Sequence, residues 1–330
     1  MNFLSSTACG GLLGLLGFLL SQPALAQKVQ PAKPQVILFV GNSFFHGAFQ
    51  PVLSYNSQGV TDENYQPART GQRRRQYEHE AGPWGGIPGI FKKLTDEAGL
   101  SYEVHLEAIS GQTLKFHYDS ALAVIQQPKW DKVVLHDYST GPVPTRHGGE
   151  PARFYAYATR LEQAVHTANP AAQVYLYETW ARADLTYPTG KGYSGLPLDS
   201  MTHDLHTAYY QEAAHNGHFA GVAPAGDAWL RAVQQGVAMP NPYAPAAGKV
   251  DLWGPDHYHP SIYGAYLNAC VLLAEITGQD PRKLGPQEQA AAALGIASGV
   301  AVQLQKLAYE QVHAAKAAGK GKLKPKAKRR

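Results

Sequence analysis

Short apolar runs alternate with longer amphipathic segments along this chain. The predicted first strand, 35–40, contains five consecutive apolar residues from Val36 to Val40, which is typical of a strand buried on both faces. Further strand patterns cover 102–108, 130–135, 173–177 and 219–223, and helical patterns cover 84–99, 114–127, 151–168, 201–216, 226–236, 261–277 and 286–316. Strands that alternate with helices predict one α/β domain, a doubly wound three-layer α/β/α sandwich with about five parallel strands.

A serine follows the first predicted strand directly, in the turn Gly41-Asn42-Ser43. Open parallel sheets bind ligands beyond the carboxyl ends of their strands. Ser43 is therefore expected at a ligand site. By the same reasoning, the segments after the third and fourth strands, 136–139 and 178–182, reach this edge of the sheet.

An acid and a base stand together far downstream, in Asp256-His257-Tyr258-His259, between two prolines that stiffen a turn. A serine hydroxyl needs a neighbouring base to take its proton, and histidine suits that task near neutral pH. An aspartate holds the imidazole in the productive tautomer. Because residues i and i+3 of a turn face the same way, the spacing favours His259 over His257 as the partner of Asp256.

These two motifs resemble those of the SGNH, or GDSL-type, hydrolases, in the family's order and across roughly residues 35–280. The resemblance implies a flavodoxin-like fold and a catalytic triad of Ser43, Asp256 and His259. It also implies an oxyanion hole that includes the backbone N–H groups of Ser43 and Gly111. A plain turn glycine is an equal alternative for Gly111.

The chain departs from the family after the third predicted strand. The family places an asparagine there as a further oxyanion donor, whereas this chain has His136-Asp137-Tyr138-Ser139. The hydroxyl of Tyr138, or the ring of His136, is the candidate replacement. The departure bears on efficiency and substrate choice more than on the class of reaction.

Three further residues are candidates for contact with substrate: Asn42 in the serine turn, and Trp180 and Arg182 after the fourth strand. For the last two, packing at the edge of the sheet is an equally good interpretation. Residues 45–83 lack clear periodicity and are expected to form a long insertion that overhangs the site.

We expect no metal and no cofactor. Four histidines gather in 203–218, at positions 203, 206, 215 and 218. One helix cannot direct all four at a single ion, because residues 203 and 215 lie about 120° apart around it. The single cysteine after the first 26 residues, Cys270, falls in a helical core pattern and is expected to be buried and inert.

The two ends of the chain carry their own signals. Residues 1–26 lack charged side chains, contain an apolar run and end in Ala24-Leu25-Ala26, which predicts a secretory signal peptide cleaved near Ala26. The hydrolase domain is then expected over 27–315, followed by a disordered basic tail, 316–330. That tail holds eight Lys and Arg residues, whereas the whole chain has a net charge of +4, so the remainder carries −4 and nucleic-acid binding is not expected.

The combined expectation is a secreted or periplasmic serine esterase with no transmembrane segment. O-acetyl esters on extracellular polysaccharide are the preferred substrates, by family resemblance and location. A short-chain lipid esterase is the alternative, and a glycan-binding protein with weakened catalysis is the alternative outside the enzymes. The sequence does not indicate an oligomeric state.

Overall fold

The computed structural model describes residues 33–65 and 82–322, together with Met1 and Phe3. The chain divides into two units, Met1–Ala32 and Lys33–Arg330, and the strands and helices of the described residues belong to the second. Most of the predicted signal peptide, part of the predicted insertion and the last eight residues lie outside the described residues.

Six parallel strands form one sheet in the order β2-β3-β1-β4-β5-β6 within the described part of the chain. The strands are β1 (Gln35–Gly41), β2 (Val60–Asp62), β3 (Tyr102–Ala108), β4 (Lys132–Leu135), β5 (Gln173–Glu178) and β6 (Gly221–Pro224). The apolar strand β1 lies at the centre, between β3 and β4, which explains why both of its faces are buried. The predicted α/β class is confirmed.

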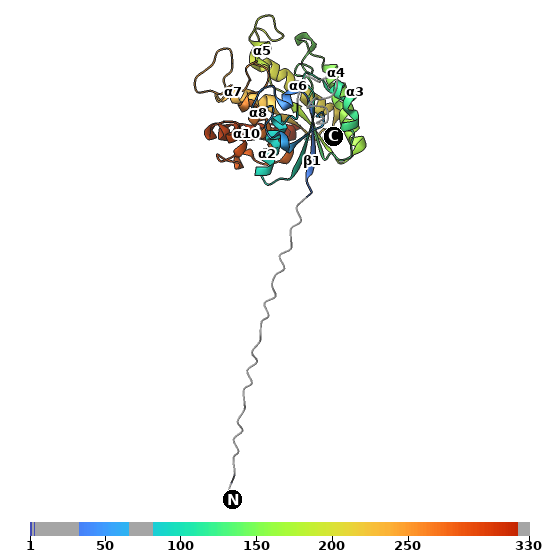
Figure 1. The fold of residues 1–330 in the computed structure, drawn as a ribbon, viewed down its shortest axis with the longest axis vertical. Coiled ribbons are helices and arrows are strands. Elements are labelled where there is room, and N and C mark those ends of the chain that lie inside the picture. The colour runs from blue at the N-terminus through green and yellow to red at the C-terminus, as the bar shows by residue number, and fades with distance from the viewer. Residues whose placement is uncertain (2, 4–32, 66–81, 323–330) are drawn as a thin grey trace, which may run out of the picture. The chain divides into compact units, whose positions relative to one another are not determined.

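Helices cover both faces of this sheet (Figure 1). One apolar cluster packs α2 (Gly86–Glu97), α7 (Ala225–Gln234), α8 (Ile262–Leu272) and α10 (Ser298–Lys322) against one face. The other cluster packs α3 (Leu114–Ile125), α4 (Pro151–Ala168) and α6 (Leu198–Asn216) against the opposite face. The remaining helices are short: α1 (Ser43–His46), α5 (Ala183–Thr186) and α9 (Gln289–Ala293).

The structure departs from the sequence-based prediction at three places. The extra strand, β2, lies inside the predicted insertion, and its three residues are too few to show a period. The predicted helix 286–316 is two helices, because Gly295 adopts a left-handed conformation with φ 77° after α9. Helix α10 continues to Lys322, into the segment 316–330 that was predicted as a tail, and Lys316 pairs with Glu275 at 3.2 Å.

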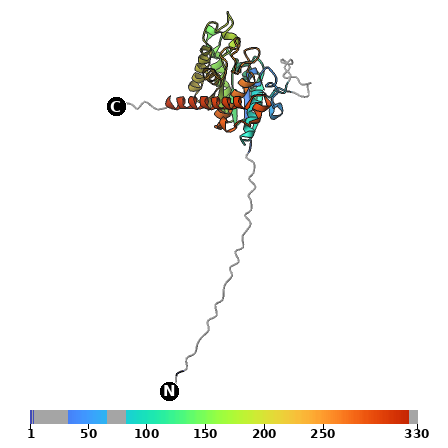
Figure 2. The ribbon, with the colours of Figure 1, turned by 90° about the vertical axis from the view of Figure 1, so that its left-hand side faces the viewer.

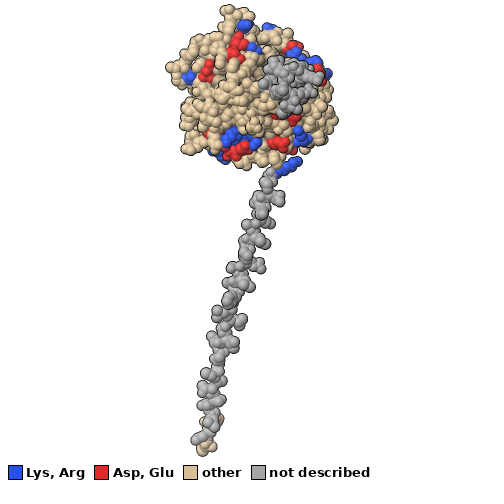
Figure 3. All heavy atoms as spheres, in the orientation of Figure 1, with Lys and Arg blue, Asp and Glu red and all other residues tan. Residues whose placement is uncertain are grey.

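Figure 2 shows α10 as a long helix that extends beyond the other elements toward the C-terminus. On the face drawn in Figure 3, acidic and basic side chains lie interspersed, and no large field of one sign is visible there. In the part of the chain that the structure describes, no helix is both long enough and apolar enough to span a membrane.

Candidate active site

Ser43 is placed at the carboxyl end of the central strand by the turn that the sequence predicts. It is the first residue of α1, and the Asn42 side chain caps that helix by accepting a hydrogen bond from the Phe44 N–H at 3.1 Å. The amide nitrogen of Asn42 donates to the carbonyls of Gln112 at 2.9 Å and Asp137 at 3.3 Å. Asn42 is 2% exposed and does not line the cavity described below, so it fixes the turn rather than facing that space.

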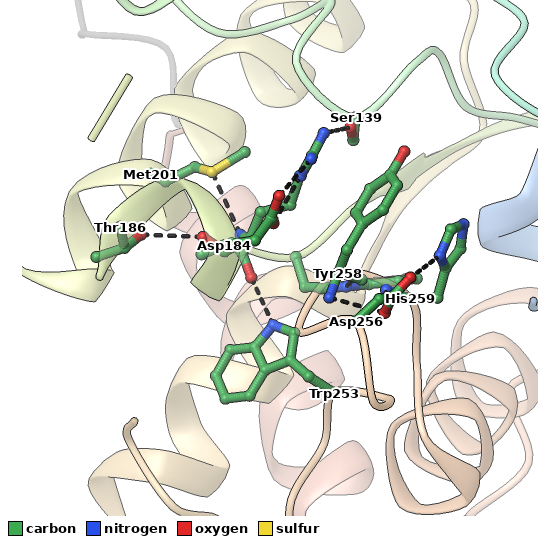
Figure 4. Close-up of polar contacts among 11 residues, drawn as sticks. Ser139, Asp184, Thr186, Met201, Trp253, Asp256, Tyr258 and His259 are labelled. Atoms are coloured by element: carbon green, nitrogen blue, oxygen red, sulfur yellow. Dashed lines mark hydrogen bonds and ion pairs between the residues drawn. The ribbon is translucent and has the colours of Figure 1, made fainter. Parts of the chain in front are cut away.

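A chain of hydrogen bonds joins Ser43 to the distant Asp256–His259 turn. The Nε2 atom of His259 lies 2.8 Å from the Ser43 hydroxyl, and its Nδ1 atom lies 2.6 Å from Oδ2 of Asp256. Oδ1 of Asp256 accepts the backbone N–H groups of His259 at 2.9 Å and Tyr258 at 3.1 Å. One carboxylate thus orients both the ring and the backbone of His259, as Figure 4 shows for Asp256 and His259.

The electrostatics of this turn favour an ionised aspartate. Burial raises the pKa of Asp256, but the hydrogen bonds from the ring and backbone of His259 and from the backbone of Tyr258 outweigh it, so the pKa lies below its usual value. An ionised Asp256 accepts a hydrogen bond from Nδ1–H of His259, so the ring proton stays on Nδ1. The Nε2 atom that faces Ser43 is then unprotonated and able to take the hydroxyl proton.

His257, the other histidine of the motif, does not reach Ser43. Its backbone is in the left-handed region with φ 56°, and its ring lies 4.1 Å from the ring of Tyr243, between centroids. The carbonyl of His257 accepts the Asp184 N–H at 3.2 Å. The i, i+3 pair is therefore the one that the turn brings to the serine.

A cavity of about 550 Å³ opens in front of Ser43 and His259. Its other lining residues are His46, Gly47, Ala48, Leu53, Trp84, Ser110, Gly111, Tyr138 and Tyr258. Residues 46–53 belong to the predicted insertion, so its described part does border the site, while 66–81 lie outside the described residues. Gly111 has φ 69°, and no other heavy atom lies within 4 Å of the position that a Cβ would take.

The two candidates for the missing asparagine donor occupy different environments. Tyr138 lines the cavity, but His136 is fully buried and does not line it. Nε2 of His136 accepts the Asn42 N–H at 3.3 Å, and Nδ1 donates to the Asp137 carbonyl at 2.8 Å. Burial lowers the pKa of His136 to about 3, so the ring is neutral, and both nitrogens are already engaged. This geometry argues against His136 as an oxyanion donor.

Gly41 has a packing role that the sequence did not reveal. A Cβ at this position would lie 2.3 Å from Nε2 of His136. The ring therefore occupies the space that a side chain would need. The glycine allows His136 to pack directly beneath the serine turn.

Trp180 and Arg182 contact Tyr258 of the Asp256–His259 turn and do not line the cavity. Trp180 is fully buried, stacks on Phe44 at 4.1 Å between ring centroids and donates to the Tyr258 carbonyl at 3.1 Å. The alternative interpretation for Trp180, packing at the edge of the sheet, is therefore what the structure shows.

Arg182 is 9% exposed and fully engaged with protein groups. It forms two hydrogen bonds with the Asp184 carboxylate, at 3.0 and 2.6 Å, and a third with the Ser139 hydroxyl at 3.1 Å. Its guanidinium lies 3.7 Å from the centre of the Tyr258 ring. Figure 4 shows Asp184, Ser139 and Tyr258 close together, and each of the three contacts the Arg182 guanidinium. The arrangement holds Tyr258, and with it the adjacent His259, in place.

Sequence reasoning missed several residues that build the site. Tyr258 lines the cavity, and Trp253 anchors the turn by donating to the Ala181 carbonyl at 2.9 Å. Tyr258 could have been proposed from the sequence, because it lies between Asp256 and His259 in the acid–base motif. Trp84 and Leu53 gave no local signal, because their contact with the cavity depends on how the long segment after Ser43 folds back.

The chain is similar in fold to several solved structures. No protein-family model and no curated protein sequence matches the chain. A DUF4886 family protein from Bacteroides uniformis is 16% identical, with a TM-score of 0.53 over 85% of this chain and 95% of that one. A GDSL-like lipase described as putative, from Parabacteroides merdae, is 16% identical, with a TM-score of 0.48 over 75% and 97%. Axe2, an acetylxylan esterase from Geobacillus stearothermophilus, is 17% identical, with a TM-score of 0.44 over 73% and 94%. At these identities the likeness concerns the fold alone, and the first structure supports the α/β class.

Proposed function

We propose that this protein is a serine esterase of the SGNH type, which hydrolyses esters by acyl transfer to Ser43. The observation that carries the proposal is the unbroken chain of hydrogen bonds from Asp256 through His259 to the Ser43 hydroxyl, beside an open cavity. Each part has the residue type and distance that nucleophilic catalysis requires.

In the proposed reaction, Ser43 attacks the ester carbonyl while Nε2 of His259 takes its proton. His259 then protonates the leaving alcohol, and a water molecule, activated by the same ring, hydrolyses the acyl-enzyme. Asp256 stabilises the imidazolium that forms in each step. The backbone N–H groups of Ser43 and Gly111, with the hydroxyl of Tyr138, are the proposed donors to the oxyanion.

The preferred substrate is an acylated carbohydrate, above all an O-acetyl ester. The cavity volume of about 550 Å³ suits a small substrate. Three aromatic residues at its wall, Trp84, Tyr138 and Tyr258, offer flat faces to a ring-bearing alcohol. A site outside the cytoplasm follows from the predicted signal peptide and rests on the sequence.

Fluorophosphonate labelling and ester turnover test the proposal together. The label should attach to Ser43, and Ser43→Ala and His259→Ala should each lower kcat on a p-nitrophenyl ester by roughly 10⁴-fold or more. The double variant should be little worse than either single one, because the two residues act as one unit. His257→Ala is the matched control from the same turn and should retain most of the activity.

A folded Ser43→Ala protein with wild-type turnover, or a label on another serine, would contradict the proposal. A panel of acetylated oligosaccharides and short-chain glycerides then separates the two substrate classes by kcat/KM. The non-enzymatic alternative predicts that acetylated oligosaccharides bind without turnover and without a fluorophosphonate adduct.

A further inference from the structure

Three residues whose side chains can bind a metal ion lie close together, away from Ser43. Glu178 ends strand β5, His206 lies on α6, and Asp227 lies in the first turn of α7. One potential ligand atom from each lies within 4.8 Å of the others. None of the three lines the cavity at Ser43, so the cluster is separate from the proposed active site.

The Glu178 carboxyl group is the unusual member of this cluster. Glu178 is fully buried, and among the described residues no hydrogen-bond partner lies within 3.5 Å of either carboxyl oxygen; its interaction at longer range is with Asp227. Burying a carboxyl group without a partner is costly, and natural structures rarely leave one in that state. A second carboxylate, that of Asp227, lies beside it.

The Asp227 carboxylate accepts hydrogen bonds from two side chains, an imidazole and an amide. Oδ2 of Asp227 accepts from Nδ1 of His206 at 2.9 Å and from the amide of Gln311 at 3.2 Å. The side chain of His206 is 43% exposed, so this end of the cluster is open to solvent. An ion from solution can therefore reach the buried Glu178 by way of His206.

We propose that Glu178, His206 and Asp227 bind one divalent transition-metal ion of the Zn²⁺ class. Two carboxylate oxygens and one imidazole nitrogen form a ligand set that Zn²⁺ accepts, with water completing the coordination. Mg²⁺ and Ca²⁺ prefer sites made of oxygen ligands alone, and in greater number. Since Zn²⁺ holds its ligands about 2.0–2.2 Å away, His206 rotates inward on binding, as its exposure allows.

The ion would tie three elements together behind the proposed active site. Two residues after Glu178 stands Trp180, which stacks on Phe44 and donates to the Tyr258 carbonyl. A cation that fixes the end of β5 to α6 and α7 therefore stabilises the segment that supports the Asp256–His259 turn. Its role is structural, and no step of the ester hydrolysis passes through it.

Calorimetric titration of tag-free, chelator-treated protein with Zn²⁺ tests the inference. We expect one equivalent to bind and the melting temperature to rise. Glu178→Gln should abolish this binding, and His206→Gln should weaken it by roughly ten-fold or more. The matched control is His203→Gln, an exposed histidine on the same helix, which should bind Zn²⁺ as the wild type does. X-ray absorption at the zinc edge should show a first shell of nitrogen and oxygen only.

Absence of stoichiometric binding, or binding that survives both Glu178→Gln and His206→Gln, overturns the inference. Equal affinity for Ca²⁺ overturns the assignment to transition metals. If Glu178→Gln fails to fold, His206→Gln decides the matter, because its exposed side chain can be exchanged without disturbing the core. Ester turnover is not the readout, so this test is independent of the proposed function.

Discussion

Replacement of Asp256 by asparagine tests how the aspartate works in the proposed reaction. In the structure, Oδ1 of Asp256 accepts two backbone N–H groups, and Oδ2 accepts Nδ1–H of His259 at 2.6 Å. An asparagine can keep the two backbone bonds through its carbonyl oxygen. Its amide N–H₂ then faces Nδ1 of His259, which must become an acceptor. The ring proton moves to Nε2, and His259 can no longer take the proton of Ser43.

The expected loss follows from this change of tautomer. The corresponding aspartate-to-asparagine change in a serine protease lowers kcat by about 10⁴-fold, so we expect a loss of that order here. It corresponds to about 5.4 kcal/mol in the activation barrier. KM should change little, because the Asp256 side chain does not line the cavity. The stability cost should stay below about 1 kcal/mol, since the Asp256 side chain is 34% exposed and solvent screens it.

Steady-state hydrolysis of a p-nitrophenyl ester, with urea unfolding of the same preparations, measures both effects. Asp280→Asn is the matched control, because Asp280 also caps a turn and pairs with a basic side chain, away from the cavity. The double variant Ser43→Ala, Asp256→Asn should be no slower than Ser43→Ala alone. A folded Asp256→Asn protein within ten-fold of wild-type kcat would refute the reasoning.

The remaining predictions concern the supports of the site. Arg182→Lys keeps the charge but loses the paired bonds to Asp184 and the flat contact with Tyr258, so kcat should fall roughly ten-fold with KM little changed. Arg282→Lys is the control, because Arg282 also pairs with an aspartate and lies 3.4 Å from a tyrosine ring centre; equal kinetics for the two variants would reject the role of Arg182.

Burial lowers the pKa of His136 to about 3 in the folded state, whereas the unfolded chain has the usual value of about 6.5. The unfolded state therefore binds a proton more readily than the folded state. The contribution of His136 to stability is complete above a pH of about 6.5 and is lost as the pH falls toward 3. The protonation of His136 in the unfolded state should therefore lower the free energy of unfolding by about 2 kcal/mol between pH 7 and pH 5. Urea unfolding should show a shallower pH slope for His136→Asn, and an equal slope would contradict the assignment.

Local features of the chain could be predicted from the sequence because they depend on neighbours along it. The apolar run before Gly41 specified a buried parallel strand, and the Gly41-Asn42-Ser43 turn placed a serine at its end. The spacing of Asp256 and His259 specified their pairing within one turn. Helix α2 shows its four apolar residues, Ile87, Ile90, Phe91 and Leu94, buried as the helical period predicts.

Only the tertiary structure decided which distant side chains meet. His259 reaches Ser43 across 216 positions of sequence, which requires the strand order and the packing of the turn on Trp180 and Arg182. The buried, neutral state of His136 follows from its contact with Gly41, and the cluster at Glu178 joins a strand and two helices. Periodicity and turn signals report on local backbone geometry. Contacts between remote elements depend on sheet order and side-chain packing, which no local pattern contains.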